Sequence, residues 1–440
     1  MTVGSTRSPF RTVASALILS AFLFASVAAP ASADPVPDGL WYYDSFQVKE
    51  AHDAGWTGKG VTVAVIDSQI NLTVPTLGSA DIELPLSEAC KDIDGKDMPA
   101  TSTDFSASHA TNVVSFIVGS GAGYPGQQGV KGVAPGAKVL FFAAGGTTPG
   151  DASDEMNCDS DSVDASAVTT AVARGAQIIS VSLGVESTPG LIAAIAGAER
   201  AGVVILGALP NETSVDDEAP AGNFPAAANG VVTVQAIGVD NLIEATDGIP
   251  NVFLDTKTDI AGPGIALLTQ GSTDPNRWEG VTIGDGTSYA TPIIAGFLAV
   301  VKQKYPAATG NQLIQTLIRN TGNGNHSLSR DAKGEVGYGV ASLTHMLDVD
   351  PTTYPDVNPL ISTESGQKPT LQQLGVSPSA TQPIPAQTAT EAVLALWFLP
   401  VVIGSVGLLG TIAILIVVVS RRRKRIIPAE PTPERENHQG

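Results

Sequence analysis

Gly286-Thr287-Ser288-Tyr289-Ala290-Thr291-Pro292 leads directly into an apolar run that continues to Val301. A glycine turn followed by such a run is the pattern of a loop that becomes a buried helix. Ser288 then lies in the first helical turn, where unpaired N–H groups and the positive end of the helix dipole favour a neighbouring oxyanion. The stretch therefore predicts a serine suited to acyl transfer. The spacing alone leaves open a plain Thr/Ser helix start.

Short apolar runs rich in β-branched residues alternate along the chain with longer segments of helical character. The expected strands are 61–66, 137–142, 177–181, 203–206 and 231–236, and the expected helices are 108–117, 162–174 and 189–201. The strands are almost continuously hydrophobic, which is typical of strands buried on both faces of a parallel sheet. The alternation predicts an α/β fold with a doubly wound sheet, in which functional groups gather at the carboxyl ends of the strands.

Two further residues at such strand and helix ends could act with Ser288. Asp67 follows the strand expected at 61–66, although a turn-forming or helix-capping Asp is the alternative. His109 opens a predicted helix. The other histidines between residues 34 and 348 are His52, His326 and His345. A serine hydroxyl needs a base near neutral pH, and a histidine held by a buried carboxylate supplies one. We therefore predict that Asp67, His109 and Ser288 act together.

Five landmarks in the same order resemble the subtilisin-like serine proteases, or subtilases. They are VAVIDS at 63–68, HATNVV at 109–114, GVAPGA at 132–137, ISVSLG at 179–184 and GTSYATP at 286–292. Smaller similarities are DIAGPG at 259–264 and GYG at 337–339. The resemblance covers about residues 40–348. It implies the family's three-layer α/β/α fold with a mostly parallel central sheet.

The resemblance implies a serine endopeptidase mechanism for the matching residues. Ser288 would attack the scissile carbonyl, His109 would act as base and then as acid, and Asp67 would orient and stabilise the imidazolium. The family's oxyanion hole pairs an Asn side chain with the backbone N–H of the serine. Asn211 matches that position, and Asn223 is the competing residue, although it lies late in the loop.

The family binds its polypeptide substrate as an extended strand. The resemblance places the substrate beside Ser182, Leu183 and Gly184, with Gly207, Ala208 and Leu209 helping to wall the pocket. An ordinary strand and turn are the alternative for both segments. The resemblance implies no required cofactor.

The chain also departs from the family pattern near these residues. Ser68 and Gln69 follow the aspartate where a glycine is usual, and Ala110, Asn112 and Pro210 replace the usual Gly, His and Gly. None of these changes removes a catalytic group, but Pro210 restricts the backbone directly before Asn211. An alternative function is therefore a catalytically weak or silent subtilase-like module that binds exported partners or stabilises a secretion complex. An unrelated serine hydrolase is a third possibility, but the sequence has no G-x-S-x-G elbow, and the order Asp, His, Ser differs from that of the α/β-hydrolase fold.

The two ends of the chain predict export and anchoring. Residues 1–33 carry Arg7 and Arg11, an apolar run and a small-residue cleavage site, which together predict a signal peptide. Residues 392–420 are long and apolar enough for a transmembrane helix, and the tail at 421–440 begins with a basic cluster that stays cytoplasmic. A buried core helix is the alternative, but nothing after it could cover it. The catalytic domain is therefore expected outside the cell, held at the cell membrane by a single span.

The region between these ends divides into two parts. Residues 34–348 are expected as the peptidase domain, and residues 349–391, rich in Pro, Thr, Ser and Gln, as an extended stalk. This order of signal, protease, stalk, span and basic tail resembles the mycosins, which are membrane-anchored subtilases associated with type VII secretion in actinobacteria. That resemblance implies a secretion complex as a partner.

Charge and cysteine content narrow the remaining possibilities. The net charge of −19 excludes a nucleic-acid partner. Cys90 and Cys158 both lie in the exported part, so they predict one disulfide, with two free buried thiols as the alternative. The acidic run at 151–164 lacks the glycine and distal glutamate of an EF-hand loop. We interpret that run as a solvated loop and assign no metal ligands, with structural calcium as the alternative.

Overall fold

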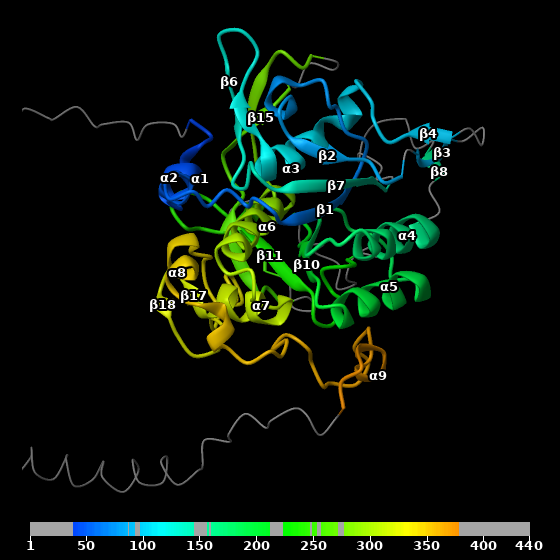
Figure 1. Cartoon of the computed structure of the whole chain (residues 1–440), viewed down its shortest axis with the longest axis vertical. Helices are drawn as coiled ribbons and strands as arrows, with labels where there is room; N and C mark the ends of the chain where they lie inside the picture. The colour runs from blue at the N-terminus through cyan, green and yellow to red at the C-terminus, as the bar shows by residue number, and fades with distance from the viewer. Residues whose placement is uncertain are drawn as a thin grey trace, which may run out of the picture. The chain divides into compact units, whose positions relative to one another are not determined.

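The structure is a computed structural model. It describes residues 38–377 except 87, 93–96, 145–155, 158–159, 212–222, 247–248, 253–256 and 272–276 (Figure 1). The compact unit to which these residues belong extends to Gly375.

Seven parallel strands form the central sheet, in the order β14-β11-β10-β9-β1-β7-β2. They are β1 (Thr62–Asp67), β2 (Asp81–Glu83), β7 (Lys138–Ala143), β9 (Ile178–Val181), β10 (Val204–Ala208), β11 (Val232–Ile237) and β14 (Ile260–Pro263). The strands predicted from the sequence are β1, β7, β9, β10 and β11, so the mostly parallel α/β fold is confirmed. The two edge strands are short and were not predicted.

Helices cover both faces of the sheet because successive residues of each strand point to opposite sides. In β1, Val63 and Val65 belong to a core that also holds α3 (Ser108–Val118) and α6 (Thr287–Lys304). Ala64 and Ile66 belong to a second core with α4 (Ser160–Ala173) and α5 (Pro189–Arg200). Figure 1 shows α4 and α5 lying side by side. The result is a three-layer arrangement in which both faces of β1 are dry.

Smaller elements connect these layers. The remaining helices are α1 (Trp41–Ser45), α2 (Val48–Asp53), α7 (Gly310–Arg319), α8 (Leu343–Asp348) and α9 (Leu371–Leu374), with 3₁₀ turns at Pro75–Leu77, Phe105–Ala107 and Pro351–Thr353. The remaining strands are β3 (Glu88–Asp92), β4 (Asp97–Pro99), β5 (Ser120–Ala122), β6 (Gln128–Lys131), β8 (Met156–Asn157), β12 (Ala245–Thr246), β13 (Ile249–Pro250), β15 (Leu267–Gln270), β16 (Val281–Gly284), β17 (Asn320–Thr321) and β18 (Gly324–Asn325).

The predicted boundary between the domain and a stalk at residue 349 is wrong. Residues 349–375 continue the compact unit, and α9 packs against α5 (Figure 1). The buried amide of Asn229 donates to the carbonyls of Ser362 and Pro369 and accepts the N–H of Ser362 at 2.7 Å. We call residues 349–375 the C-terminal strap. Side-chain amides hold much of it through its backbone, and this kind of attachment leaves no hydrophobic period in the sequence.

Several predictions fall outside the described residues. These are the signal peptide at 1–33, the span at 392–420, the tail at 421–440 and Cys158. No helix in the described part of the chain is long and apolar enough to cross a bilayer. The side chains of the acidic run up to residue 163 are likewise outside the description.

Candidate active site

The carboxyl end of β1 and the start of α3 bring Asp67 and His109 together. Nδ1 of His109 donates to Oδ1 of Asp67 at 2.8 Å, and the same oxygen accepts the N–H of Ser68 at 2.7 Å. Asp67 is fully buried. Because Nδ1 carries the donated proton in this pair, Nε2 of the neutral ring is left as a proton acceptor. This is the arrangement that a general base requires.

Two opposing effects set the pKa of His109. Burial of the ring disfavours its positive charge, but the charge of Asp67 and the hydrogen bond to it outweigh burial, so the pKa is raised above its ordinary value. The same pair therefore stabilises the imidazolium that forms when His109 accepts a proton.

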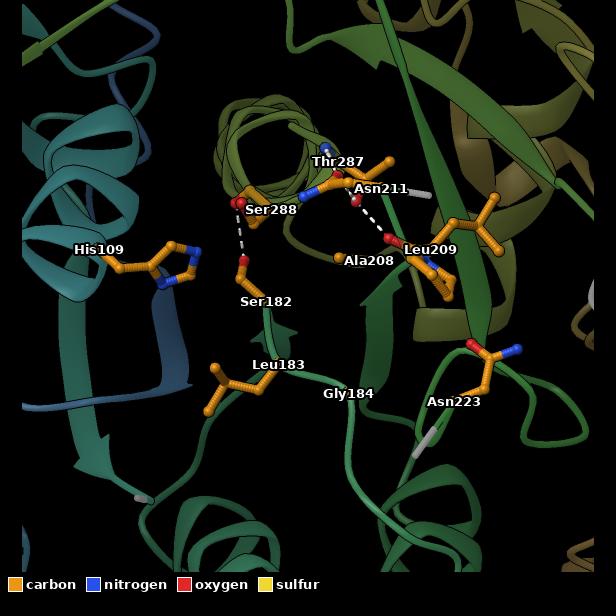
Figure 2. Close-up of a pocket in the computed structure, with 11 residues that line it drawn as sticks. His109, Ser182, Leu183, Gly184, Ala208, Leu209, Asn211, Asn223, Thr287 and Ser288 are labelled. Atoms are coloured by element: carbon orange, nitrogen blue, oxygen red, sulfur yellow. Dashed lines mark hydrogen bonds between the residues drawn. The ribbon is translucent and has the colours of Figure 1, made fainter. Parts of the chain in front are cut away.

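Ser288 lies in the first turn of α6. Two residues before Ser288, Gly286 has a φ of 151°, which is accessible mainly to glycine. A Cβ at Gly286 would stand 3.1 Å from Oγ of Ser288 and 3.3 Å from Nδ2 of Asn211. Figure 2 shows the imidazole of His109 pointing toward Ser288 across the pocket. Within the described part of the chain no hydrogen bond joins the two side chains, and such contacts often tighten only when substrate binds.

A proline inside α6 frees a backbone carbonyl through which the turn that carries Ser288 is joined to the sheet. Pro292 lacks the N–H that would bond to the carbonyl four residues earlier, which is the carbonyl of Ser288. The hydroxyl of Ser182, directly after β9, donates to this carbonyl at 2.8 Å (Figure 2). Ser182 thus joins the predicted substrate-binding segment to the backbone of Ser288.

Asn211 stands beside Ser288, whereas Asn223 lies at the other end of the pocket (Figure 2). Oδ1 of Asn211 accepts the backbone N–H of Thr287 at 2.9 Å, and the Thr287 hydroxyl is at the same distance. That hydroxyl also contacts the carbonyl of Leu209. Because Oδ1 is occupied, Nδ2 is the group that Asn211 can offer to the pocket. Of the two candidate residues, this geometry favours Asn211.

These residues line a cavity of about 270 Å³. Its walls are His109, Ser182, Leu183, Gly184, Ala208, Leu209, Pro210, Asn211, Asn223, Thr287 and Ser288. Apart from His109 none of them carries an ionisable side chain. Gly207, which the resemblance also placed here, is not in the lining, since a Cβ on it would stand 2.7 Å from the backbone nitrogen of Ala226.

The contacts of Thr287 were not predicted from the sequence. Its signal was only its position between the turn glycine and Ser288, which does not show that its N–H and hydroxyl meet the Asn211 side chain. Pro210, noted only as a departure from the family pattern, proves to line the cavity directly.

Known proteins similar to this chain are proteases. The chain is 28% identical over 285 residues to the minor extracellular protease Epr of Bacillus subtilis, covering 64% of this chain but 38% of Epr. It is 30% identical over 268 residues to the major intracellular serine protease of the same species, covering 61% of this chain and 75% of that protein. The chain therefore spans well under half of Epr and three quarters of the second relative.

Solved structures support the fold. Fervidolysin of Fervidobacterium pennivorans, a keratinolytic enzyme related to subtilisin, matches with a TM-score of 0.53 and 22% identity, over 70% of this chain and 45% of its own. A protease of Pseudoalteromonas arctica matches with a TM-score of 0.54 and 23% identity, over 72% of this chain and 98% of its own. At this level of identity, the likeness concerns the fold alone.

The family comparison covers the folded core. The profile of the subtilase family matches residues 58–339, which include the end of β1, the start of α3 and the start of α6. Homologues in this family are serine endopeptidases. Together with the shared fold, the match over more than half of the sequence establishes that the chain belongs to the subtilase family of serine proteases.

Proposed function

We propose that this protein is a membrane-anchored extracellular serine endopeptidase that cleaves peptide bonds through Asp67, His109 and Ser288. The observation that carries the proposal is the hydrogen bond between Asp67 and His109, whose ring lines the same cavity as Ser288. The buried carboxylate fixes the tautomer of the imidazole, so that Nε2 can take a proton on the Ser288 side.

In the first step Oγ of Ser288 bonds to the scissile carbonyl carbon while Nε2 of His109 takes the hydroxyl proton. The electron pair of the carbonyl moves onto its oxygen, beside Nδ2 of Asn211 and the N–H of Ser288. Both are donors held before substrate arrives: Thr287 holds Asn211, and the start of α6 leaves the N–H of Ser288 without a helical acceptor. Donors fixed in this way stabilise developing charge without reorganising.

In the second step the C–N bond breaks as His109 returns its proton to the leaving amine, which leaves an acyl-enzyme on Ser288. Water then adds to the acyl carbon, His109 takes a proton from it, and Ser288 leaves with that proton restored. No cofactor is needed at any step.

The substrate would lie extended beside Ser182, Leu183 and Gly184, as the sequence resemblance implies. Among the described residues, the lining of the cavity between this segment and Ala208–Leu209 carries no ionisable side chain other than His109. We therefore expect uncharged side chains before the cleaved bond to be preferred over Lys, Arg, Asp or Glu, because a charge would lose hydration there without gaining a partner.

Labelling with a serine-directed fluorophosphonate and cleavage of a peptide library test this function. The native protein should label and cleave, whereas Ser288→Ala and His109→Ala should do neither. Ser327→Ala, at an exposed serine of the same domain, is the matched control and should behave as the native protein does. A native protein that keeps its circular dichroism spectrum but neither labels nor cleaves would instead support the alternative of a silent module that binds exported partners.

The location and the secretion partner rest on the sequence. The predicted signal peptide, the span at 392–420 and the basic tail support an ectodomain outside the cell, and the order of segments supports a mycosin-like link to a type VII secretion complex. In cells making the full chain, external protease should degrade an epitope in the catalytic domain and spare one at the C-terminus. Degradation of neither or both epitopes in intact cells would contradict the orientation.

A disulfide between Cys90 and Cys158 is part of the proposal. The pairing of β3 with β8 sets Lys91 opposite Asn157, one residue from each cysteine, which supports the bridge. Alkylation without reduction should leave the mass unchanged, and alkylation after reduction should add two adducts. For the acidic run at 151–164, a bound structural calcium ion is the alternative to a solvated loop. If calcium binds there, a chelator should lower the Tm of the protein.

A further inference from the structure

Tyr289 places its ring between the proposed base and the buried interior. Its centroid lies 6.0 Å from that of His109, with 31° between the ring planes, and 5.3 Å from that of Phe116. Phe116 in turn meets the ring of Tyr42 edge-on at 5.9 Å. Phe116 and Tyr42 are fully buried. A continuous aromatic row therefore runs from the core of the domain to His109.

A glycine without a side chain leaves space for the Tyr289 ring. A Cβ on Gly284, at the end of β16, would stand 3.0 Å from Cε2 of Tyr289. The ring is thus enclosed by Gly284, Phe116 and His109, and it has little freedom to turn away. Aromatic pairs at these separations attract one another beyond their shared apolar area.

The ring contact with Tyr289 restrains His109 in a way that the hydrogen bond to Asp67 does not. Asp67 bonds to Nδ1 at the edge of the imidazole, and a single hydrogen bond leaves the ring free to tilt about it. The Tyr289 ring lies beside the same imidazole, with 6.0 Å between the centroids and 31° between the planes. A tilt of the imidazole would separate the two rings, so the pair fixes a plane as well as a tautomer.

Proton transfer by the Tyr289 hydroxyl itself is unfavourable near neutral pH. Burial, together with the charges of Asp67 and Asp285, raises its pKa to about 12. The hydroxyl therefore stays protonated near neutral pH, and the contact with His109 that the structure shows is made by the ring.

We propose that Tyr289 is a positioning residue for His109: its ring holds the imidazole in the plane that directs Nε2 at Ser288, and it shields the Asp67–His109 hydrogen bond from water. The inference rests on the proposed function, in which His109 is the base. It also adds a role for the residue between Ser288 and Ala290, which the family signature leaves variable.

Two substitutions in the full chain separate the ring from the space it fills. Tyr289→Phe keeps the ring, whereas Tyr289→Leu keeps apolar bulk without a ring. We expect the Leu variant to lose about 3- to 10-fold in kcat, the range of one aromatic contact, with KM within about twofold because Tyr289 does not line the cavity. The Phe variant should retain the native kcat. Tyr338→Leu, at a tyrosine that packs on Arg330, is a control for losing a ring elsewhere.

A spectroscopic arm does not depend on turnover. The low-field proton resonance of the Asp67–His109 hydrogen bond is measured in the Ser288→Ala background, alone and with each Tyr289 substitution. It should persist with Phe and broaden with Leu through faster exchange with water. A native protein without turnover would defeat the proposed function, yet this resonance would still test Tyr289.

The role of Tyr289 is overturned if the Leu variant keeps both the native kcat and the native resonance, or if Phe loses as much as Leu. Leucine could also leave a void that unfolds the domain. Tyr289→Met, whose longer and more flexible side chain can adapt to the space, is therefore measured beside it with the Tm of each variant. A folded Met variant must show the same loss of kcat and the same broadening.

Discussion

The Asn211 side chain is held by the residue that directly precedes Ser288: its Oδ1 accepts the backbone N–H of Thr287 at 2.9 Å. One hydrogen bond therefore links the loop after β10 to the first turn of α6. It satisfies one of the N–H groups that the start of a helix leaves unpaired. It also sets which way the amide of Asn211 faces, and so connects the two halves of the proposed oxyanion hole.

Replacing Asn211 with Ala should lower kcat by about 10²- to 10³-fold with little change in KM, because a donor of this kind acts mainly on the transition state. Peptide hydrolysis under saturating and limiting substrate measures both constants. Asn311→Ala, on the exposed side of α7, is the matched control. A comparable loss in Asn223→Ala with Asn211→Ala near native would mean that the donor has been assigned to the wrong residue.

The pairing of His109 with Asp67 predicts the pH dependence of activity. His109 must be neutral to accept the Ser288 proton, and its pKa is raised above the ordinary 6.5. Activity should therefore fall as pH drops, with the midpoint of the acid limb above 6.5. The profile of kcat/KM, which reports the free enzyme, measures this midpoint.

Asp67→Asn tests the cause of that shift. Without the carboxylate charge, the acid limb should move to lower pH, and kcat should fall by about four orders of magnitude because the imidazole loses its preferred tautomer. Asp53→Asn, at an exposed helix position, removes the same charge far from the site and serves as control. An unmoved acid limb in Asp67→Asn would show that another group titrates there.

The parts of this molecule that were predictable are those governed by hydrophobic burial and sheet geometry. Val63 and Ile66 lie in a continuous apolar run because β1 is covered on both faces, and the sequence shows this directly. Once a parallel sheet is inferred, Asp67 at the end of β1 must lie at its functional edge.

The features that escaped prediction depend on individual polar contacts. The hydrogen bond between Thr287 and Asn211 joins residues from separate elements, and its formation depends on the rotamer of Asn211. The composition of the strap predicts a stalk, because the carbonyls that Asn229 binds belong to the backbone and leave no mark on residue type. The resemblance places Gly207 in the pocket, whereas the lining begins at Ala208, and the Cβ side of Gly207 is closed by Ala226.

The C-terminal strap should be part of the stable domain. Ending the chain after residue 348 leaves the buried amide of Asn229 without its partners, and one buried polar group left unsatisfied costs about 1–3 kcal/mol. Gln312 and Gln315 of α7 would also lose the strap carbonyls that they bind. We expect the free energy of unfolding to fall by at least about 3 kcal/mol in total.

Urea unfolding followed by tryptophan fluorescence measures the change. A chain ending after residue 377 retains every one of these contacts and is the matched control. Equal stability of the two truncated chains would restore the original interpretation of this segment as a stalk.

Glu199, on α5, should make stability fall as the pH rises. Neither of its carboxylate oxygens has a hydrogen-bond partner among the described residues, and burial raises its pKa from 4.5 to about 8. Between these values the folded chain binds a proton that the unfolded chain has lost, so unfolding becomes easier with increasing pH until the folded pKa is passed. Glu199→Gln, which mimics the protonated form, should remove this dependence.

Each pKa unit corresponds to about 1.4 kcal/mol. The stability of the Glu199→Gln variant should therefore rise by roughly 3 to 5 kcal/mol relative to that of the native chain between pH 5 and pH 9. Urea unfolding at both pH values measures this difference, in which the pH-independent cost of burying an amide cancels. Glu50→Gln, at an exposed position of α2, should stay within about 0.5 kcal/mol throughout. A Glu199→Gln variant whose stability keeps parallel to that of the native chain from pH 5 to pH 9 would mean that Glu199 is already ionised in the folded domain.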